Sequence, residues 1–74
     1  MDKINKLNKK IHSNIIFEMK KNKITQLELA DKLRIKDSSI NRSLKNLEKG
    51  KSILTETLFK FADGLGVEVV ELLR

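Results

Sequence analysis

Apolar residues in the first segment recur at steps of three and four, the spacing that puts side chains on one face of an α-helix. They are Ile4, Leu7, Ile11, Ile15 and Met19. No glycine interrupts the segment, so the pattern predicts a helix over about residues 4–21. The other face is rich in lysine, and a basic amphipathic helix either packs into a bundle or lies on a membrane. Phe17 is its only aromatic residue, which favours the bundle.

Residues 25–28 read Thr-Gln-Leu-Glu, the sequence of a capping box. In this motif the Thr25 hydroxyl accepts a hydrogen bond from the Glu28 amide, and the Glu28 carboxylate accepts one from the Thr25 amide. A second helix is therefore expected from Thr25 to about Arg34. Ile35 follows the break and is expected to be buried.

Three consecutive residues suit the start of a third helix, namely Asp37, Ser38 and Ser39. Asp37 also suits the positive end of the helix dipole, so we expect its carboxylate to cap the helix. Apolar positions then keep helical spacing up to Gly50, a residue type that ends helices in a left-handed conformation. The third helix is expected over about residues 38–49.

A fourth helix is marked by apolar residues that lead up to Gly66. They are Leu54, Leu58, Phe61, Ala62 and Leu65. The tail, residues 67–74, is ambiguous, because its valines favour a strand while Leu72 and Leu73 suit a short helix; we expect the helix. The chain is therefore predicted to be all-α, a compact bundle of about five helices that forms a single domain over residues 1–74.

The composition excludes several classes of site. The 74 residues include no cysteine and one histidine, His12, so neither a disulfide nor a thiolate metal site can form. The sequence has no glycine-rich phosphate loop and no clustered carboxylates at matched spacing. We expect no enzyme activity, no cofactor and no metal, with His12 facing solvent. No apolar run approaches the roughly 18 residues that span a bilayer, so a cytoplasmic protein with no membrane partner is expected.

Charge is unevenly distributed along the chain. The protein has 16 basic and 10 acidic residues, which gives a net charge of +6. Residues 1–23 carry a net +5 and residues 24–51 a net +3, whereas residues 52–74 carry a net −2. A polyanion such as DNA is therefore expected to meet the first two thirds of the molecule. The last third is left for packing or self-association.

The second and third helices, joined by the short turn Arg34–Lys36, form a helix-turn-helix pattern. An α-helix fits the major groove of DNA, and the N-terminal residues of the second helix of such a pair reach the base edges there. The pattern therefore predicts contact between the third helix and double-stranded DNA.

Four sequence motifs follow one another in this region: TQxELADKLxI at residues 25–35, IxR at 40–42, LEKGK at 47–51 and TLxKFAxxLGV at 57–67. In this order they resemble the Cro and lambda-repressor-type helix-turn-helix family, also called the XRE family, over about residues 15–73. The resemblance implies a DNA-binding domain of five helices that acts as a transcriptional regulator, commonly as a homodimer on palindromic operators.

The resemblance also assigns roles to residues of this chain. Gln26 matches the glutamine that begins the first motif helix and braces against a phosphate. The exposed start of the recognition helix is matched by Asp37, Ser38, Ser39, Asn41 and Arg42. From their chemistry, Asn41 can pair bidentately with adenine and Arg42 with guanine, while the serine hydroxyls suit bases or phosphates.

The sequence departs from the family pattern at three places. Arg34 stands where the family usually has glycine in the turn, so we expect Arg34 to adopt a left-handed backbone conformation, which costs about 1 kcal/mol of stability. The Arg34 side chain can also reach a phosphate. Residues 40–50 exceed the common spacing by about four residues, or one helical turn. Because Leu44 and Leu47 continue the helical stripe, we interpret this as a longer recognition helix and not as a looped insertion. Leu27 occupies a usually polar position and either packs against the first helix, which we expect, or belongs to a partner surface.

The predicted DNA-contacting residues lie in the motif and its flanks: Gln26, Arg34, Lys36, Ser38, Ser39, Asn41, Arg42, Lys45, Asn46, Lys49 and Lys51. Residues 1–10 precede the family core and either extend the first helix or form a basic arm along the DNA. In the arm, phosphates would be neutralised by Lys3, Lys6, Lys9 and Lys10. The helical spacing of Ile4, Leu7 and Ile11 favours the extension.

These observations predict a sequence-specific, double-stranded DNA-binding regulator, specifically a small homodimeric repressor of phage or plasmid type. One short helix reads only a few base pairs, so a second copy supplies the remaining affinity. The predicted dimer patch is Val69, Val70, Leu72 and Leu73. The alternative is a protein-interaction module, antitoxin-like or an anti-repressor partner, that binds a protein through Leu27 and the tail. Salt separates the two, because binding to phosphates weakens steeply with salt and apolar docking does not.

Overall fold

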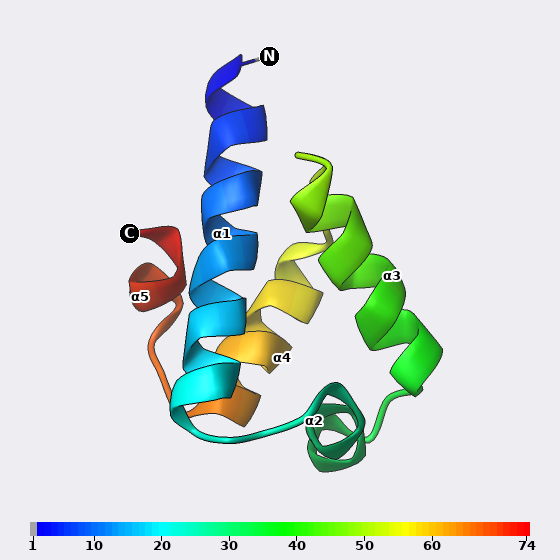
Figure 1. The fold of residues 1–74 in the computed structure, drawn as a ribbon. Coiled ribbons are helices and arrows are strands. Elements are labelled where there is room, and N and C mark those ends of the chain that lie inside the picture. Colours follow the sequence, from blue (N-terminus) through cyan, green and yellow to red (C-terminus); the bar gives the residue numbers. More distant parts are fainter. Residues whose placement is uncertain (1) are drawn as a thin grey trace.

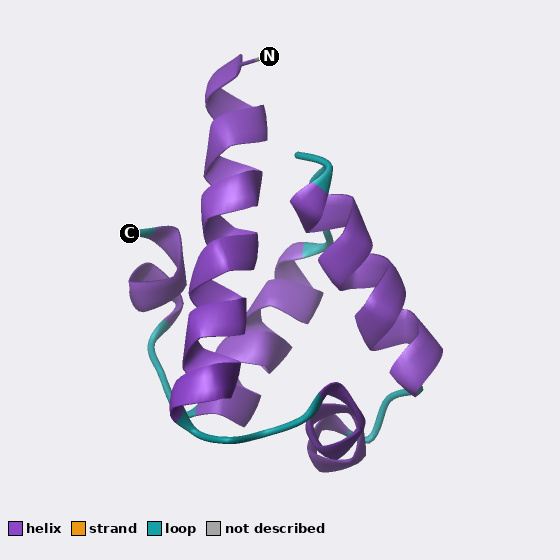
Figure 2. Ribbon diagram, viewed as in Figure 1, coloured by secondary structure: helices purple, strands orange, loops and turns teal. Residues whose placement is uncertain are grey.

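Helices form where the apolar spacing predicts them (Figure 1). The computed structural model describes residues 2–74, and its helices are α1 (Asp2–Lys21), α2 (Gln26–Leu33), α3 (Asp37–Glu48), α4 (Thr55–Leu65) and α5 (Val69–Leu73). Short loops join them, and residues 2–74 contain no strand (Figure 2). The predicted all-α architecture is therefore confirmed, including the helical tail.

The first helix is longer than predicted at its N-terminal end. Residues 2–10 continue α1 without a break, so they form the helical extension and not an arm; Met1, the first residue of that segment, lies outside the described residues. Ile11 and Ile15 are buried, whereas Ile4 and Leu7 remain 55% and 41% exposed. The end of α1 projects past the other helices (Figure 1), so the expectation that these two residues pack in the bundle was wrong.

One hydrophobic core joins all the helices. Its fully buried side chains come from each of them in turn: Ile15 on α1, Leu29 on α2, Ile40 and Leu47 on α3, Phe61 on α4, and Leu72 on α5. Burial of each such side chain contributes about 1.5–3 kcal/mol. Ile35, expected to be buried after the turn, is half-buried and packs against this core.

The start of α2 has the hydrogen bonds of a capping box. The Glu28 amide donates to Thr25 Oγ1 at 3.1 Å, and the Thr25 amide donates to Glu28 Oε1 at 2.8 Å. The helix ends at Arg34, which has left-handed backbone angles of φ 58° and ψ 40° and an amide that bonds the carbonyls of the preceding turn. Both sequence predictions for α2 are confirmed.

The next helix is continuous over Asp37–Glu48, so the added residues lengthen the helix, as predicted. Gly50 follows it with a φ of 86°, and Gly66 ends α4 with a φ of 72°. None of the helices within residues 2–74 is long and apolar enough to cross a bilayer.

Candidate nucleic-acid interface

Two opposite faces of α3 have opposite character. Ile40, Leu44 and Leu47 face the core and are buried. The outward face carries what we call the α3 stripe, made of Ser38, Arg42 and Lys45 on the helix and of Lys49, its C-cap residue. These residues follow one another at steps of four, three and four, so they line up on the side of the helix away from the core. All of them are exposed.

The cations of the α3 stripe have no acidic partner within the described chain. Among residues 2–74 the one ion pair joins Lys60 to Glu56 on α4, at 3.9 Å. Arg42, Lys45 and Lys49 therefore face solvent without an ion-pair partner among the described residues. Exposed cations without internal partners are the groups that neutralise the phosphates of DNA.

Other predicted contact residues lie around the α3 stripe. Ser39 is exposed near the start of α3, and Asn41 and Asn46 are half-buried at its two borders. The preceding turn exposes Arg34 and Lys36. Lys51 is also exposed and follows the end of α3, so basic groups stand at both ends of this helix.

The start of α3 differs from the prediction. Lys36 is the N-cap residue and makes no side-chain capping bond, and Asp37 is already the first residue of the helix. The expected cap by Asp37 was therefore wrong. Its Oδ1 instead accepts a hydrogen bond from Gln26 Nε2 at 3.2 Å, which links the first residues of the two motif helices, while its charge still lies at the positive end of the dipole.

This bond bears on the role expected for Gln26. The residue is half-buried at the first position of α2, where it was expected to brace against a phosphate. Its amide nitrogen is used by Asp37, which leaves the amide oxygen and the second N–H for other contacts. Gln26 thus orients the start of α3 within the protein itself.

The surfaces expected to meet other proteins are only partly as predicted. Leu27 is 68% exposed, so the expectation that it packs against α1 was wrong. In the predicted dimer patch, Leu72 is fully buried and Val69 is half-buried, whereas Val70 and Leu73 are 52% and 37% exposed. His12, expected to face solvent, is half-buried.

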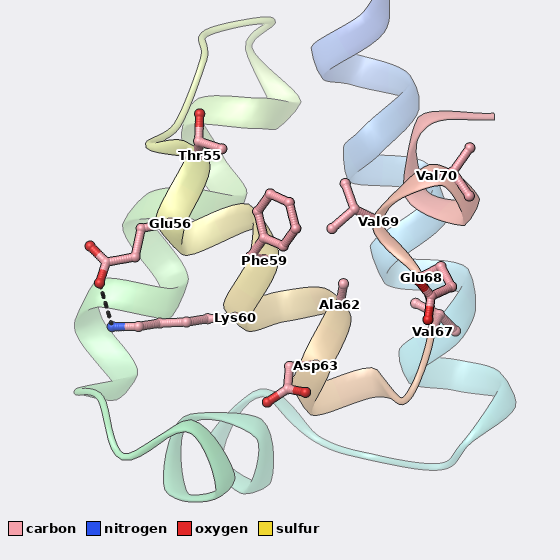
Figure 3. Close-up of a pocket in the computed structure, with 10 residues that line it drawn as sticks. All are labelled: Thr55, Glu56, Phe59, Lys60, Ala62, Asp63, Val67, Glu68, Val69 and Val70. Carbon is pink, nitrogen blue, oxygen red and sulfur yellow. Dashed lines mark ion pairs between the residues drawn. The ribbon is translucent and has the colours of Figure 1, made fainter.

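The sequence did not single out two residues that the structure makes notable, one on the surface and one buried. Phe59 on α4 is 57% exposed and points toward Val69 across a groove of about 630 Å³ (Figure 3). Asn8 is the buried polar residue of the core, with 5% of its surface exposed. A signal for Asn8 was available, because it lies four residues after Ile4 and three before Ile11, on the apolar stripe of α1.

A family model for a helix-turn-helix domain matches residues 17–72, about three quarters of the 74-residue chain. Comparisons with curated proteins and with solved structures gave no significant match. The matched region begins inside α1 and contains the whole of α2, α3 and α4, with Arg34 and the α3 stripe. By this match and by its helical architecture, the chain belongs to the Cro/lambda-repressor-type helix-turn-helix family of DNA-binding regulators.

Proposed function

We propose that this protein recognises a specific sequence in double-stranded DNA and acts there as a small homodimeric repressor of phage or plasmid type. The observation that carries the proposal is the α3 stripe, an exposed row of one serine and three unpaired cations on the second helix of the motif. The whole chain acts as a single DNA-binding domain. Its place of action is the cytoplasm, where such an operator lies.

In the proposed complex α3 lies in the major groove with its N-terminal half against the bases. Arg42 is the residue whose guanidinium matches the two acceptors of guanine, and Asn41 beside it has the amide that matches adenine. Each such bidentate pair discriminates against a wrong base by about 1–3 kcal/mol. Ser38 and Ser39 are short enough to serve bases or nearby phosphates.

Phosphate contacts position the helix along the groove. The turn before α3 offers Arg34 and Lys36, and the added turn at its other end offers Lys45, Asn46 and Lys49, followed by Lys51. This set spans the full length of α3. Because each neutralised phosphate releases counterions, affinity is expected to fall steeply as salt is raised.

We also propose that the two copies meet through α5 and the groove beside it. Val70 and Leu73 are exposed on α5, and Phe59 stands across the groove on α4 (Figure 3). The segment that contains them, residues 52–74, carries a net −2, while the rest of the chain carries the excess positive charge. Contact at this side keeps the two basic regions apart, which limits their repulsion.

A second candidate function is docking to another protein, and the exposure of Leu27 favours it. This leucine is 68% exposed on α2, at a position that carries no evident role in DNA binding. A protein partner that covers an apolar side chain would bind with little dependence on salt. Leu27→Ser would abolish such binding and, because it adds no charge, leave the salt-dependent binding of DNA unchanged.

Selection from a pool of random duplexes tests the proposed function. Wild-type protein is expected to enrich one sequence motif, and Arg42→Ala is expected to lose the preference at one base pair of each half-site. Arg74→Ala removes the same charge on the side of the molecule opposite α3 (Figure 1), and it should select the wild-type motif. Failure of the wild-type protein to enrich any motif would contradict sequence-specific recognition.

A further inference from the structure

The projecting end of α1 is tied to the end of α3 by a buried asparagine. Asn8 Nδ2 donates a hydrogen bond to the Gly50 carbonyl at 3.0 Å and one to Ser52 Oγ at 3.0 Å. One turn earlier, Asn5 Nδ2 approaches the Lys49 carbonyl at 3.5 Å. These contacts join segments more than 40 residues apart in sequence. We call the set Asn5, Asn8, Lys49, Gly50 and Ser52 the Asn8 junction.

At the Asn8 junction, backbone hydrogen bonds cap the end of α3, and Gly50 packs closely against α1. The Lys51 amide donates to the Asn46 carbonyl at 2.7 Å, and the Gly50 amide donates to the Leu47 carbonyl at 2.9 Å, the two bonds of a Schellman motif. Gly50 has a positive φ, and a Cβ on it would overlap the Asn5 amide. Another residue here would adopt a strained backbone conformation and displace the Asn5 side chain, so glycine favours the close approach of α1 to the end of α3.

The junction joins the part of α1 that precedes the family match to the end of the lengthened α3. The family match begins at residue 17, so Asn5 and Asn8 precede it. The partner segment ends the added turn of α3. An extra turn on a recognition helix is exposed to fraying at its C-terminal end, where its last carbonyls have no partners within the helix. The added part of α1 supplies a donor to the carbonyl that follows this turn.

We propose that Asn8 is a positioning residue for DNA binding, which holds the last turn of the recognition helix so that Lys49 and Lys51 face the phosphates. The inference rests on the proposed function of α3. Asn8 itself is buried and touches no DNA. It acts through the backbone of Gly50, which lies between the two lysines, and through the Ser52 hydroxyl that follows them.

The chain offers a matched control for this role. Asn14, also on α1, donates from its Nδ2 to the Leu72 carbonyl of α5 at 2.8 Å. Asn8 and Asn14 thus make the same type of bond from the same helix, one toward the recognition helix and one toward the opposite side of the molecule (Figure 1). A purely structural role predicts that the two alanine variants lose stability and change nothing else.

The experiment measures binding to duplex DNA at several salt concentrations for wild type, Asn8→Ala, Asn14→Ala and the milder Ser52→Ala. Asn8→Ala is expected to bind roughly three- to tenfold more weakly, with a salt dependence reduced by the equivalent of about one or two phosphates. Ser52→Ala should show a smaller change in the same direction. Asn14→Ala should keep the wild-type salt dependence even where its melting temperature or its self-association falls.

Amide hydrogen exchange without DNA gives a second readout. Exchange of the Gly50 and Lys51 amides should become faster in Asn8→Ala and stay at the wild-type rate, relative to global unfolding, in Asn14→Ala. If wild type binds DNA and Asn8→Ala binds equally well with the same salt dependence, the proposed function stands and the positioning role is overturned. If wild type binds no DNA at any salt concentration, the proposed function itself fails, and the role of Asn8 in binding fails with it.

Discussion

At the scale of single residues, the capping box shows how one exposed side chain links helix formation to pH. The Thr25 amide, and secondarily its hydroxyl, holds the pKa of Glu28 below its usual value of 4.5. A carboxylate whose pKa is lower in the folded state stabilises the fold above its unfolded pKa. That contribution is lost as the pH falls through the folded value.

Glu28→Gln tests this linkage. Urea unfolding should give wild type a larger free energy of unfolding than the variant at pH 7, and the difference should shrink on going to pH 3. Subtracting the variant removes the effect of the other acidic groups, which titrate in both proteins. A difference that is constant between pH 3 and pH 7 would contradict a role for the ionised carboxylate.

Arg34 is expected to lower the stability of the fold and to strengthen the binding of DNA. It adopts a left-handed conformation with a φ of 58°, which costs a residue with a Cβ about 1 kcal/mol. Arg34→Gly is expected to raise the free energy of unfolding by up to about 1 kcal/mol and to weaken the binding of DNA, with a salt dependence lower by about one phosphate. Denaturant titration measures the change in stability, and binding curves at several salt concentrations measure the change in DNA affinity. Unchanged binding would show that Arg34 does not contact DNA.

At the scale of elements, apolar periodicity, caps and glycine stops predicted α1 to α4, because these are local properties of the chain, whereas the tail that forms α5 was ambiguous between strand and helix. The continuous α3 followed from its own helical spacing, whereas the left-handed Arg34 was expected from the resemblance to the family, which usually has glycine at this position. The sequence did not predict which part of each helix face is covered by other helices. Ile4 and Leu7 share the spacing of Ile11, yet only tertiary packing decides where the neighbouring helices end.

The candidate site shows the same limit. The exposed residues of the α3 stripe follow from the period of the helix, whereas the bond from Gln26 to Asp37 joins residues 11 positions apart in two helices. No local rule distinguishes this arrangement from a side-chain cap. Asn8 was missed because its partners lie in a loop more than 40 residues away.

The uneven burial of α1 can be tested with two identical substitutions. Ile15 is fully buried, so Ile15→Ala is expected to lower the free energy of unfolding by about 2–5 kcal/mol. Ile4 is 55% exposed, so Ile4→Ala should change it by less than about 0.5 kcal/mol. Denaturant titration provides both values. A large loss for Ile4→Ala would mean that a partner covers the end of α1 in solution.

At the scale of the whole molecule, the net charge changes sign along the chain, while exposed apolar residues occur in both the basic and the acidic part. The first two thirds of the chain carry the positive charge, and the acidic last third contains Phe59, Val70 and Leu73 on its surface. The difference in charge suits a molecule that binds a polyanion through its basic part and a second copy through its acidic part.

Val70→Glu tests the proposed dimer. Val70 is 52% exposed, so the fold should tolerate the change, while a carboxylate in an apolar contact between two acidic segments should prevent association. Sedimentation analysis is expected to show a dimer for wild type and a monomer for the variant. Leu27→Glu adds the same charge at another exposed apolar residue and should remain a dimer. A wild-type protein that is monomeric at all concentrations would contradict the proposal.

Recognition of a DNA sequence by α3 underlies the proposed function. Its most direct test is the ratio of affinities for the selected duplex and a scrambled duplex, measured by fluorescence anisotropy at two salt concentrations. We expect wild type to prefer the selected duplex by at least about a hundredfold, and Arg42→Ala together with Asn41→Ala to abolish this preference. Equal binding of wild type to the two duplexes at both salt concentrations would contradict it.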